Sequence, residues 1–187
     1  MPGSLFIVAA PSGSGKSTLV NALLAKEPGI SLSISYTSRG PRPGEEDGKH
    51  YHFVTREKFE EMAGEGEFFE YAIVHGDLKG TARQSVEPLL ASDQDVLLEI
   101  DYQGAQRVRA QVPSAVSIFI LPPSRLELER RLRTRAKDTE ATILRRLADS
   151  RKEIAHAWEF DYIVVNEVFD TALAEIEKIA WLRLSDF

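Results

Sequence analysis

The stretch of sequence that decides the fold is residues 5–18, LFIVAAPSGSGKST. It opens with six apolar residues, of which 5–9 are typical of a buried strand. A segment rich in glycine and serine follows, and from Lys16 onward apolar residues recur with helical spacing. A strand, a glycine-rich turn and a helix in direct succession are typical of an α/β protein built on a parallel sheet.

The glycine-rich segment fits the phosphate-loop pattern G-x-x-x-x-G-K-[ST] at every fixed position except the first, where Ala10 stands. Glycines let backbone N–H groups curl around phosphate oxygens, and the start of the helix adds a partial positive charge. Lys16 supplies a point charge to the β- and γ-phosphates, and the hydroxyl of Ser17 is a ligand for Mg²⁺. The alternative, a turn that merely opens a helix, fits the strand–loop–helix context poorly. We therefore predict a nucleoside triphosphate site formed by Ala10, Pro11, Ser12, Gly13, Ser14, Gly15, Lys16, Ser17 and Thr18.

Composition narrows the class of protein. The 187 residues carry a net charge of −6 and include no cysteine, which excludes disulfides, cysteine-ligated metals and thiol nucleophiles. Residues 105–152 hold 12 Lys and Arg against 5 Asp and Glu. One basic segment in an acidic chain suits a compact anion better than a nucleic acid. Because no apolar run is long enough for a membrane span or a signal peptide, we expect a cytoplasmic protein without membrane or nucleic-acid partners.

Strand-like and helical segments alternate along the rest of the chain. Apolar runs at 96–100, 116–121 and 162–165 are predicted strands, and Ser124 and Asp170 are predicted to cap the helices that follow the last two. Trp158 and Trp181 fall in amphipathic patterns and are predicted core residues. Two regions interrupt the alternation: 34–82 is rich in glycine, proline and short strand-like pieces, and 125–150 is charged and helical. We predict a three-layer α/β phosphate-loop fold with a central parallel sheet, a core of 1–33 with 83–124 and 151–187, a mixed-sheet insertion at 34–82 and a helical lid at 125–150.

The insertion carries residues suited to a second phosphate. Arg39 and Arg42 are three apart, and the prolines at 41 and 43 limit the freedom of the backbone between them. Guanidinium groups held in this way can each bind a phosphate through two hydrogen bonds. Tyr51 adds a hydroxyl donor nearby in the sequence. The phosphate acceptor is therefore expected to bind here.

Carboxylates in apolar surroundings indicate what else the acceptor contains. Glu70 follows two phenylalanines, while Glu99 and Asp101 alternate with Ile100 and are expected on one face of the strand that ends there. An ionised carboxylate only accepts hydrogen bonds, and guanine, unlike adenine, presents N–H donors at N1 and N2. A pocket of Ser35, Glu70 and Asp101 therefore favours guanine. From its position alone, Asp101 fits a carboxylate that faces Mg²⁺ equally well, and the two roles are compatible.

These motifs together resemble the guanylate kinases over almost the whole chain. The matching segments are 10–18, 35–44, 48–53, 68–72, 99–105, 118–124, 131 with 135, 146–147 and 163–166. The resemblance implies Mg²⁺-dependent transfer of the γ-phosphoryl group of ATP to GMP, and we expect dGMP to be accepted as well. It also implies a core, a GMP-binding insertion and a lid that closes over the core.

The resemblance assigns roles to matching residues only. It places Ser35, Glu70, Thr81 and Asp101 at guanine, and Arg39, Arg42 and Tyr51 at the GMP phosphate. It places Lys16, Arg39, Arg131, Arg135 and Arg146 at the transferring phosphoryl group, and Asn166 near the adenine of ATP.

The chain departs from the family at three places. Lys79 replaces a tyrosine that usually donates to the GMP phosphate, and we expect it to serve that phosphate as a point charge. The lid's usual glycine–arginine–glycine is Thr134-Arg135-Ala136, which predicts a stiffer hinge. Glu99 stands where many relatives have aspartate.

Three other functions fit parts of the sequence. A ribose bisphosphate phosphokinase on the same scaffold needs no guanine-reading carboxylates, and a phosphopeptide-binding module typically has a damaged phosphate loop. A GTPase normally carries an N-K-x-D motif, which is absent. The sequence does not indicate the oligomeric state.

Overall fold

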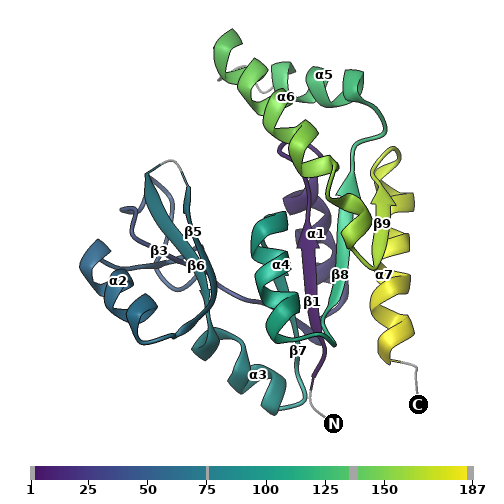
Figure 1. The fold of residues 1–187 in the computed structure, drawn as a ribbon. Coiled ribbons are helices and arrows are strands. Elements are labelled where there is room, and N and C mark those ends of the chain that lie inside the picture. Colours follow the sequence, from purple (N-terminus) through teal and green to yellow (C-terminus); the bar gives the residue numbers. More distant parts are fainter. Residues whose placement is uncertain (1–2, 75, 135–138, 185–187) are drawn as a thin grey trace. The chain divides into compact units, whose positions relative to one another are not determined.

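The computed structural model describes residues 3–74, 76–134 and 139–184 (Figure 1). By its internal contacts the chain divides into two compact units. The first unit comprises residues 1–5, 29–98 and 106–115, and the second comprises 6–28, 99–105 and 116–187. In chain order the elements are β1 (Leu5–Ala9), α1 (Lys16–Lys26), β2 (Ile30–Leu32), β3 (Tyr36–Thr37), β4 (His52–Phe53), α2 (Arg56–Gly64), β5 (Phe68–Val74), β6 (Asp77–Ala82), η1 (Arg83–Ser85), α3 (Glu87–Ala91), β7 (Asp95–Glu99), α4 (Tyr102–Gln111), β8 (Val116–Leu121), α5 (Arg125–Thr134), α6 (Glu140–Ile154), η2 (Ala157–Glu159), β9 (Tyr162–Val165) and α7 (Phe169–Leu184).

A five-stranded sheet has the order β2-β7-β1-β8-β9. The pairs β2–β7, β1–β8 and β8–β9 are parallel, with Phe6 opposite Val116 and Leu121 opposite Val165. Every residue of β1 is buried, as is expected of a parallel strand covered on both faces. The predicted α/β class with a central parallel sheet is confirmed.

Helices of the second unit pack through their apolar stripes. Helix α1 buries Leu19, Val20 and Leu23 and packs against α7. Helices α5 and α6 share a small cluster built on Leu128, Leu132 and Ile143. Burial of these side chains fixes the start of α1 and the inner face of α5, which together hold the phosphate loop described below.

The first unit contains the predicted mixed sheet, with the order β4-β3-β6-β5. Strands β5 and β6 are antiparallel, as are β3 and β6, whereas β3 and β4 are parallel. Helix α2 covers this sheet, and its fully buried Phe59 stacks on Phe68 with ring centroids 4.4 Å apart. Gly80 lies opposite Tyr71, where a Cβ atom would come within 2.8 Å of the Glu70 carbonyl oxygen, so the close pairing of β5 and β6 requires glycine here.

Several local predictions need correction. The strand β2 was not predicted, because a three-residue strand carries too short an apolar pattern. Helix α7 begins at Phe169, so Asp170 lies in its first turn rather than capping it. Trp158 and Trp181 are 77% and 60% exposed instead of lying in the core. The Ser124 cap is confirmed, since its hydroxyl accepts the N–H of Glu127 at 3.1 Å. Among the residues described, no helix has both the length and the apolarity needed to cross a bilayer.

Candidate active site

The phosphate loop lies between β1 and α1, as predicted, and residues 10–18 line a cavity of about 300 Å³ together with Glu153. Gly13 and Gly15 have φ angles of 91° and 90°, a region that other residues rarely adopt. A Cβ atom on Gly15 would also lie 2.5 Å from the side-chain nitrogen of Asn166. Both glycines are therefore required by the loop conformation, which leads directly into the N-terminus of α1 and its unpaired N–H groups.

Lys16 is held by the core of the second unit. Its Nζ donates to the carbonyl oxygen of Ile100 at 3.0 Å. Burial lowers the pKa of Lys16, and attraction to Glu99, Asp101 and Glu153 opposes that shift. The ammonium group is thus fixed beside the loop and surrounded by carboxylates that favour its charged form.

Ser17 and Glu99 form a pair of oxygen ligands next to Lys16. The Ser17 hydroxyl donates to Glu99 Oε1 at 2.5 Å. Hydroxyl and carboxylate oxygens are the ligands that Mg²⁺ prefers, and it usually takes only one or two from the protein with the rest from phosphates and water. The two residues therefore fit a Mg²⁺ ion bound together with a nucleotide.

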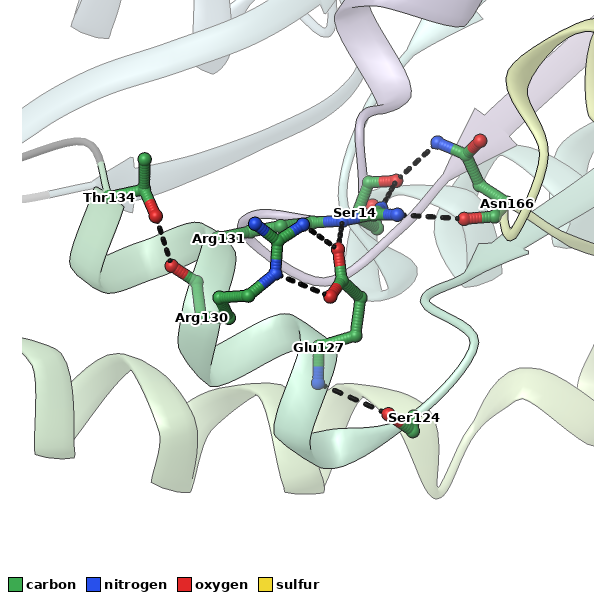
Figure 2. Close-up of polar contacts among 7 residues, drawn as sticks. All are labelled: Ser14, Ser124, Glu127, Arg130, Arg131, Thr134 and Asn166. Atoms are coloured by element: carbon green, nitrogen blue, oxygen red, sulfur yellow. Dashed lines mark hydrogen bonds and ion pairs between the residues drawn. The ribbon is translucent and has the colours of Figure 1, made fainter.

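Arg131 joins the phosphate loop to the segment after β9 (Figure 2). Its guanidinium donates to the carbonyl oxygens of Ser14 and Asn166, at 3.3 and 3.0 Å, while its Nε donates to Glu127 at 2.8 Å. The Asn166 amide donates to the same Ser14 carbonyl at 2.8 Å. Hydrogen bonds from Arg130 and Arg131 lower the pKa of Glu127 to about 2, so this carboxylate is charged at neutral pH.

A second cavity, of about 410 Å³, adjoins this network. It is lined by Gly13, Gly15, Thr18, Arg130, Arg131, Thr134, Asn166, Glu167 and Phe169. The structure therefore brings Arg131 and Asn166, two residues singled out from the sequence, to one cavity beside the loop. Of the other two lid arginines, Arg146 lies half-buried on α6, and Arg135 lies outside the described residues.

In the first unit, Arg39 is held by Glu45. Its guanidinium donates to both carboxylate oxygens, at 2.8 and 2.9 Å, and Glu45 also accepts the backbone N–H of Arg42 at 2.7 Å. These hydrogen bonds lower the pKa of Glu45 to about 2. One carboxylate therefore fixes the Arg39 side chain and the Arg42 backbone at the same time, while the Arg42 side chain is exposed.

Lys79 and Arg39 both lie over the ring of Tyr51. Lys79 Nζ is 4.9 Å and the Arg39 guanidinium carbon 5.4 Å from the ring centroid. Lys79 also donates to the Tyr51 hydroxyl at 3.2 Å. Two cations and a phenol, from three separate segments, thus meet at one place, which is the chemistry that binds a phosphate group.

Glu70 and Thr81 face each other across β5 and β6. They are directly paired in register, and the Thr81 hydroxyl donates to Glu70 Oε1 at 2.8 Å. Glu70 is 9% exposed and Thr81 is 1% exposed. The hydroxyl orients the carboxylate, whose oxygens are hydrogen-bond acceptors when ionised. Ser35 precedes β3, and its carbonyl oxygen accepts the N–H of His52 at 2.9 Å.

Asp101 belongs to the second unit, and its predicted position on a strand face is wrong. Strand β7 ends at Glu99, and the Asp101 carboxylate accepts the backbone N–H of Gly104 at 2.7 Å at the start of α4. At a helix start the first N–H groups have no partner within the helix, and an aspartate carboxylate can accept one of them. Asp101 therefore caps the start of α4 instead of extending β7. The side chain is exposed.

Comparison with known proteins identifies the family. The family model described as guanylate kinase matches residues 3–182. The chain belongs to the guanylate kinase family. It is 62% identical over 176 residues to a curated guanylate kinase from Xanthomonas oryzae pv. oryzae (strain MAFF 311018), covering 94% of this chain and 87% of that protein. A guanylate kinase from Xylella fastidiosa (strain Temecula1) is 58% identical, with coverage of 96% and 88%.

A solved guanylate kinase has the same fold. The crystal structure of the enzyme from Anaplasma phagocytophilum matches with a TM-score of 0.80 and 34% identity, covering 99% of this chain and 88% of that one. The family, the fold class and the nucleoside monophosphate kinase activity predicted from the sequence are thereby confirmed.

Sequence reasoning gave no role to three acidic residues of this guanylate kinase. Glu45 holds Arg39, Glu127 holds Arg131, and Glu153 lines the phosphate-loop cavity. The backbone N–H of Glu127 donates to the predicted cap Ser124, while its side chain accepts from Arg130 and Arg131. Glu45 stands three residues after Arg42, a spacing that could have indicated a partner for the arginines, whereas nothing in the sequence near Glu153 points to the loop.

Proposed function

We propose that this chain transfers the γ-phosphoryl group of Mg-ATP to GMP, and to dGMP, with the residues described above in defined roles. The observation that carries the acceptor assignment is the buried Glu70 carboxylate, oriented by Thr81. Guanine offers donors at N1 and N2 to such an acceptor, whereas adenine offers none at those positions. A base that lacks these donors gains no hydrogen bonds from the carboxylate and binds less tightly.

The second unit binds ATP in this proposal. Backbone N–H groups of residues 10–18 surround the phosphates, Lys16 contacts the β- and γ-phosphates, and Asn166 lies near the adenine. Ser17 holds Mg²⁺, with Glu99 beside it. When bound, the ion neutralises charge on the β- and γ-phosphate oxygens.

The first unit binds GMP. Ser35, Glu70, Thr81 and Asp101 are the residues assigned to guanine. Arg39, Arg42, Tyr51 and Lys79 bind the phosphate. The ion pair with Glu45 holds the Arg39 guanidinium in place, so little side-chain entropy is lost when the phosphate binds.

The reaction is an in-line transfer. The nucleophile is an oxygen of the GMP phosphate that is already ionised, so no strong general base is required. Lys16, Arg39, Arg131, Arg135 and Arg146 stabilise the negative charge that spreads over the transferring group. Exclusion of water from the closed site suppresses hydrolysis of ATP.

The domain division and the cellular setting are also proposals. The core consists of 1–33, 83–124 and 151–187, the GMP-binding insertion of 34–82 and the lid of 125–150. The enzyme acts on small nucleotides in the cytoplasm, without nucleic-acid or membrane partners. The basic segment at 105–152 supports a role in binding a compact anion.

The test is a phosphoryl-transfer assay with separated products. We expect GDP and ADP to form in equal amounts from GMP and Mg-ATP, and chelation of Mg²⁺ to abolish the reaction. Lys16→Met is expected to lower kcat at least about a hundredfold, because it removes the positive charge that stabilises the transferring phosphoryl group. Lys26→Met, on the same helix but 56% exposed, is the matched control and should leave kcat unchanged. Equal effects of the two substitutions would contradict the role of Lys16.

A further inference from the structure

The side-chain carboxylate of Glu153 lies at the cavity that we propose binds the phosphates of ATP. It lies in the last turn of α6 and lines the same cavity of about 300 Å³ as residues 10–18. Ser12 and Lys16, two residues of the loop, line that cavity too. Both favour the charged form of the Glu153 carboxylate and lower its pKa, against the effect of burial. The carboxylate therefore lies beside groups that the loop offers to a nucleotide.

The surroundings of Glu153 are costly for a carboxylate. Its Oε2 atom is buried and has no hydrogen-bond partner among the described residues. Burial and the nearby charges of Asp101 and Asp149 raise its pKa, whereas Lys16 and the Ser12 N–H oppose that shift. A buried carboxylate with a free oxygen is destabilising unless its interactions compensate for lost hydration. Since the buried oxygen lowers the stability of the fold, we expect the negative charge of Glu153 to have a function.

The loop itself suggests that role. Its N–H groups, the N-terminus of α1 and the Lys16 ammonium form a receptor for anions. In the structure, Glu153 is the acidic residue that lines the cavity of this receptor. Phosphates of an incoming nucleotide carry like charge and compete with the carboxylate for the Ser12 N–H and for Lys16.

We propose that Glu153 is an internal competitor of the nucleotide phosphates, occupying the phosphate loop in the free enzyme and weakening phosphate binding. The inference rests on the proposed function, since it assumes that the loop binds ATP. Its benefit to a kinase is turnover: a loop that retains ADP less tightly releases product faster. Because Glu153 belongs to α6, its displacement also links occupation of the loop to the position of that helix.

The proposal is tested by binding of Mg-pyrophosphate, measured by isothermal titration calorimetry without GMP. Glu153→Gln keeps the shape and an acceptor for the Ser12 N–H but removes the charge. We expect its Kd for pyrophosphate to be about tenfold lower than that of the wild type, because a like charge next to the ligand is gone. Asp149→Asn removes one charge from the same helix at a side chain that is 57% exposed, and should change Kd less than about twofold.

A merely structural role of Glu153 predicts the opposite sign. Loss of a contact that orders the loop would weaken binding, so an unchanged or higher Kd for Glu153→Gln overturns the proposal. Glu153→Asp, which keeps the charge but draws it back from the loop, is expected to lower Kd about threefold and decides the matter if Glu153→Gln does not fold. If the wild-type chain binds no pyrophosphate and forms no GDP, the proposed function is overturned as well. If the wild-type chain forms GDP but Glu153→Gln does not bind pyrophosphate more tightly, the proposed role of Glu153 is wrong and the proposed function stands.

Discussion

Replacing Lys79 by glutamine removes a positive charge from the proposed site of the GMP phosphate. The lysine lies on β6 opposite Thr37, and its Nζ donates to the Tyr51 hydroxyl at 3.2 Å, so its position is defined by a neighbour that we propose binds the same phosphate. The family usually has a tyrosine here, a neutral donor. The charge of this chain's phosphate site is therefore one unit higher than the family pattern implies.

The size of the effect follows from Coulomb's law. One unit charge about 4 Å from a doubly ionised phosphate gains about 2 kcal/mol at the dielectric constant of water, and more at the lower values of a partly buried site. Taking the lower figure, Lys79→Gln raises KM for GMP about 30-fold. We expect kcat to change little, because the same interaction exists before and in the transition state.

The assay is steady-state kinetics with varied GMP at saturating Mg-ATP. The matched control is Lys49→Gln, which removes the same charge from a side chain of the same unit that is 67% exposed and pairs with Glu46. The control should change KM less than about twofold. A KM for GMP within threefold of the wild-type value in Lys79→Gln would refute the assignment of Lys79 to the phosphate.

Three further predictions concern the first unit. Glu70→Gln replaces an acceptor by a group that can also donate, and should lower kcat/KM for GMP by about 10- to 100-fold in the same assay; an unchanged value would count against guanine recognition by Glu70. Because its hydrogen bonds hold the pKa of Glu45 at about 2, the Arg39–Glu45 pair contributes fully above pH 4.5 and is lost only as pH falls toward 2. An NMR titration of the Glu45 carboxyl carbon checks this, and a midpoint near 4.5 is the contrary result. Gly80→Ala inserts a Cβ 2.8 Å from the Glu70 carbonyl oxygen and should lower the free energy of unfolding by about 1–3 kcal/mol in urea denaturation. An unchanged free energy of unfolding would contradict the need for glycine between β5 and β6.

Much of the fold was predictable because its long elements have clear patterns. The strands at 5–9, 116–121 and 162–165 agree with the structure to the residue, since each is a predominantly apolar run. The exposed tryptophans were not predictable from the helical pattern alone. Trp181 is held at the surface by a hydrogen bond from its indole N–H to Glu27, a contact between two segments 154 residues apart in the chain.

The site was predictable where a motif fixes backbone and chemistry together. The phosphate loop is such a motif, because its glycines, lysine and serine are each required by the local conformation or by the phosphates. The partners of the arginines were not predictable, since Glu45 and Glu127 are ordinary surface residues by composition. Asp101 was assigned to a strand face because the apolar pattern does not show where a strand ends and a helix cap begins.

Recognition of guanine on the acceptor is tested by supplying Mg-ATP with GMP, dGMP, AMP, UMP, CMP or ribose 1,5-bisphosphate and identifying each product. We expect GDP and dGDP to form far faster than ADP forms from AMP. No transfer to GMP by a chain that binds ATP, or equal transfer to AMP and GMP, would contradict it.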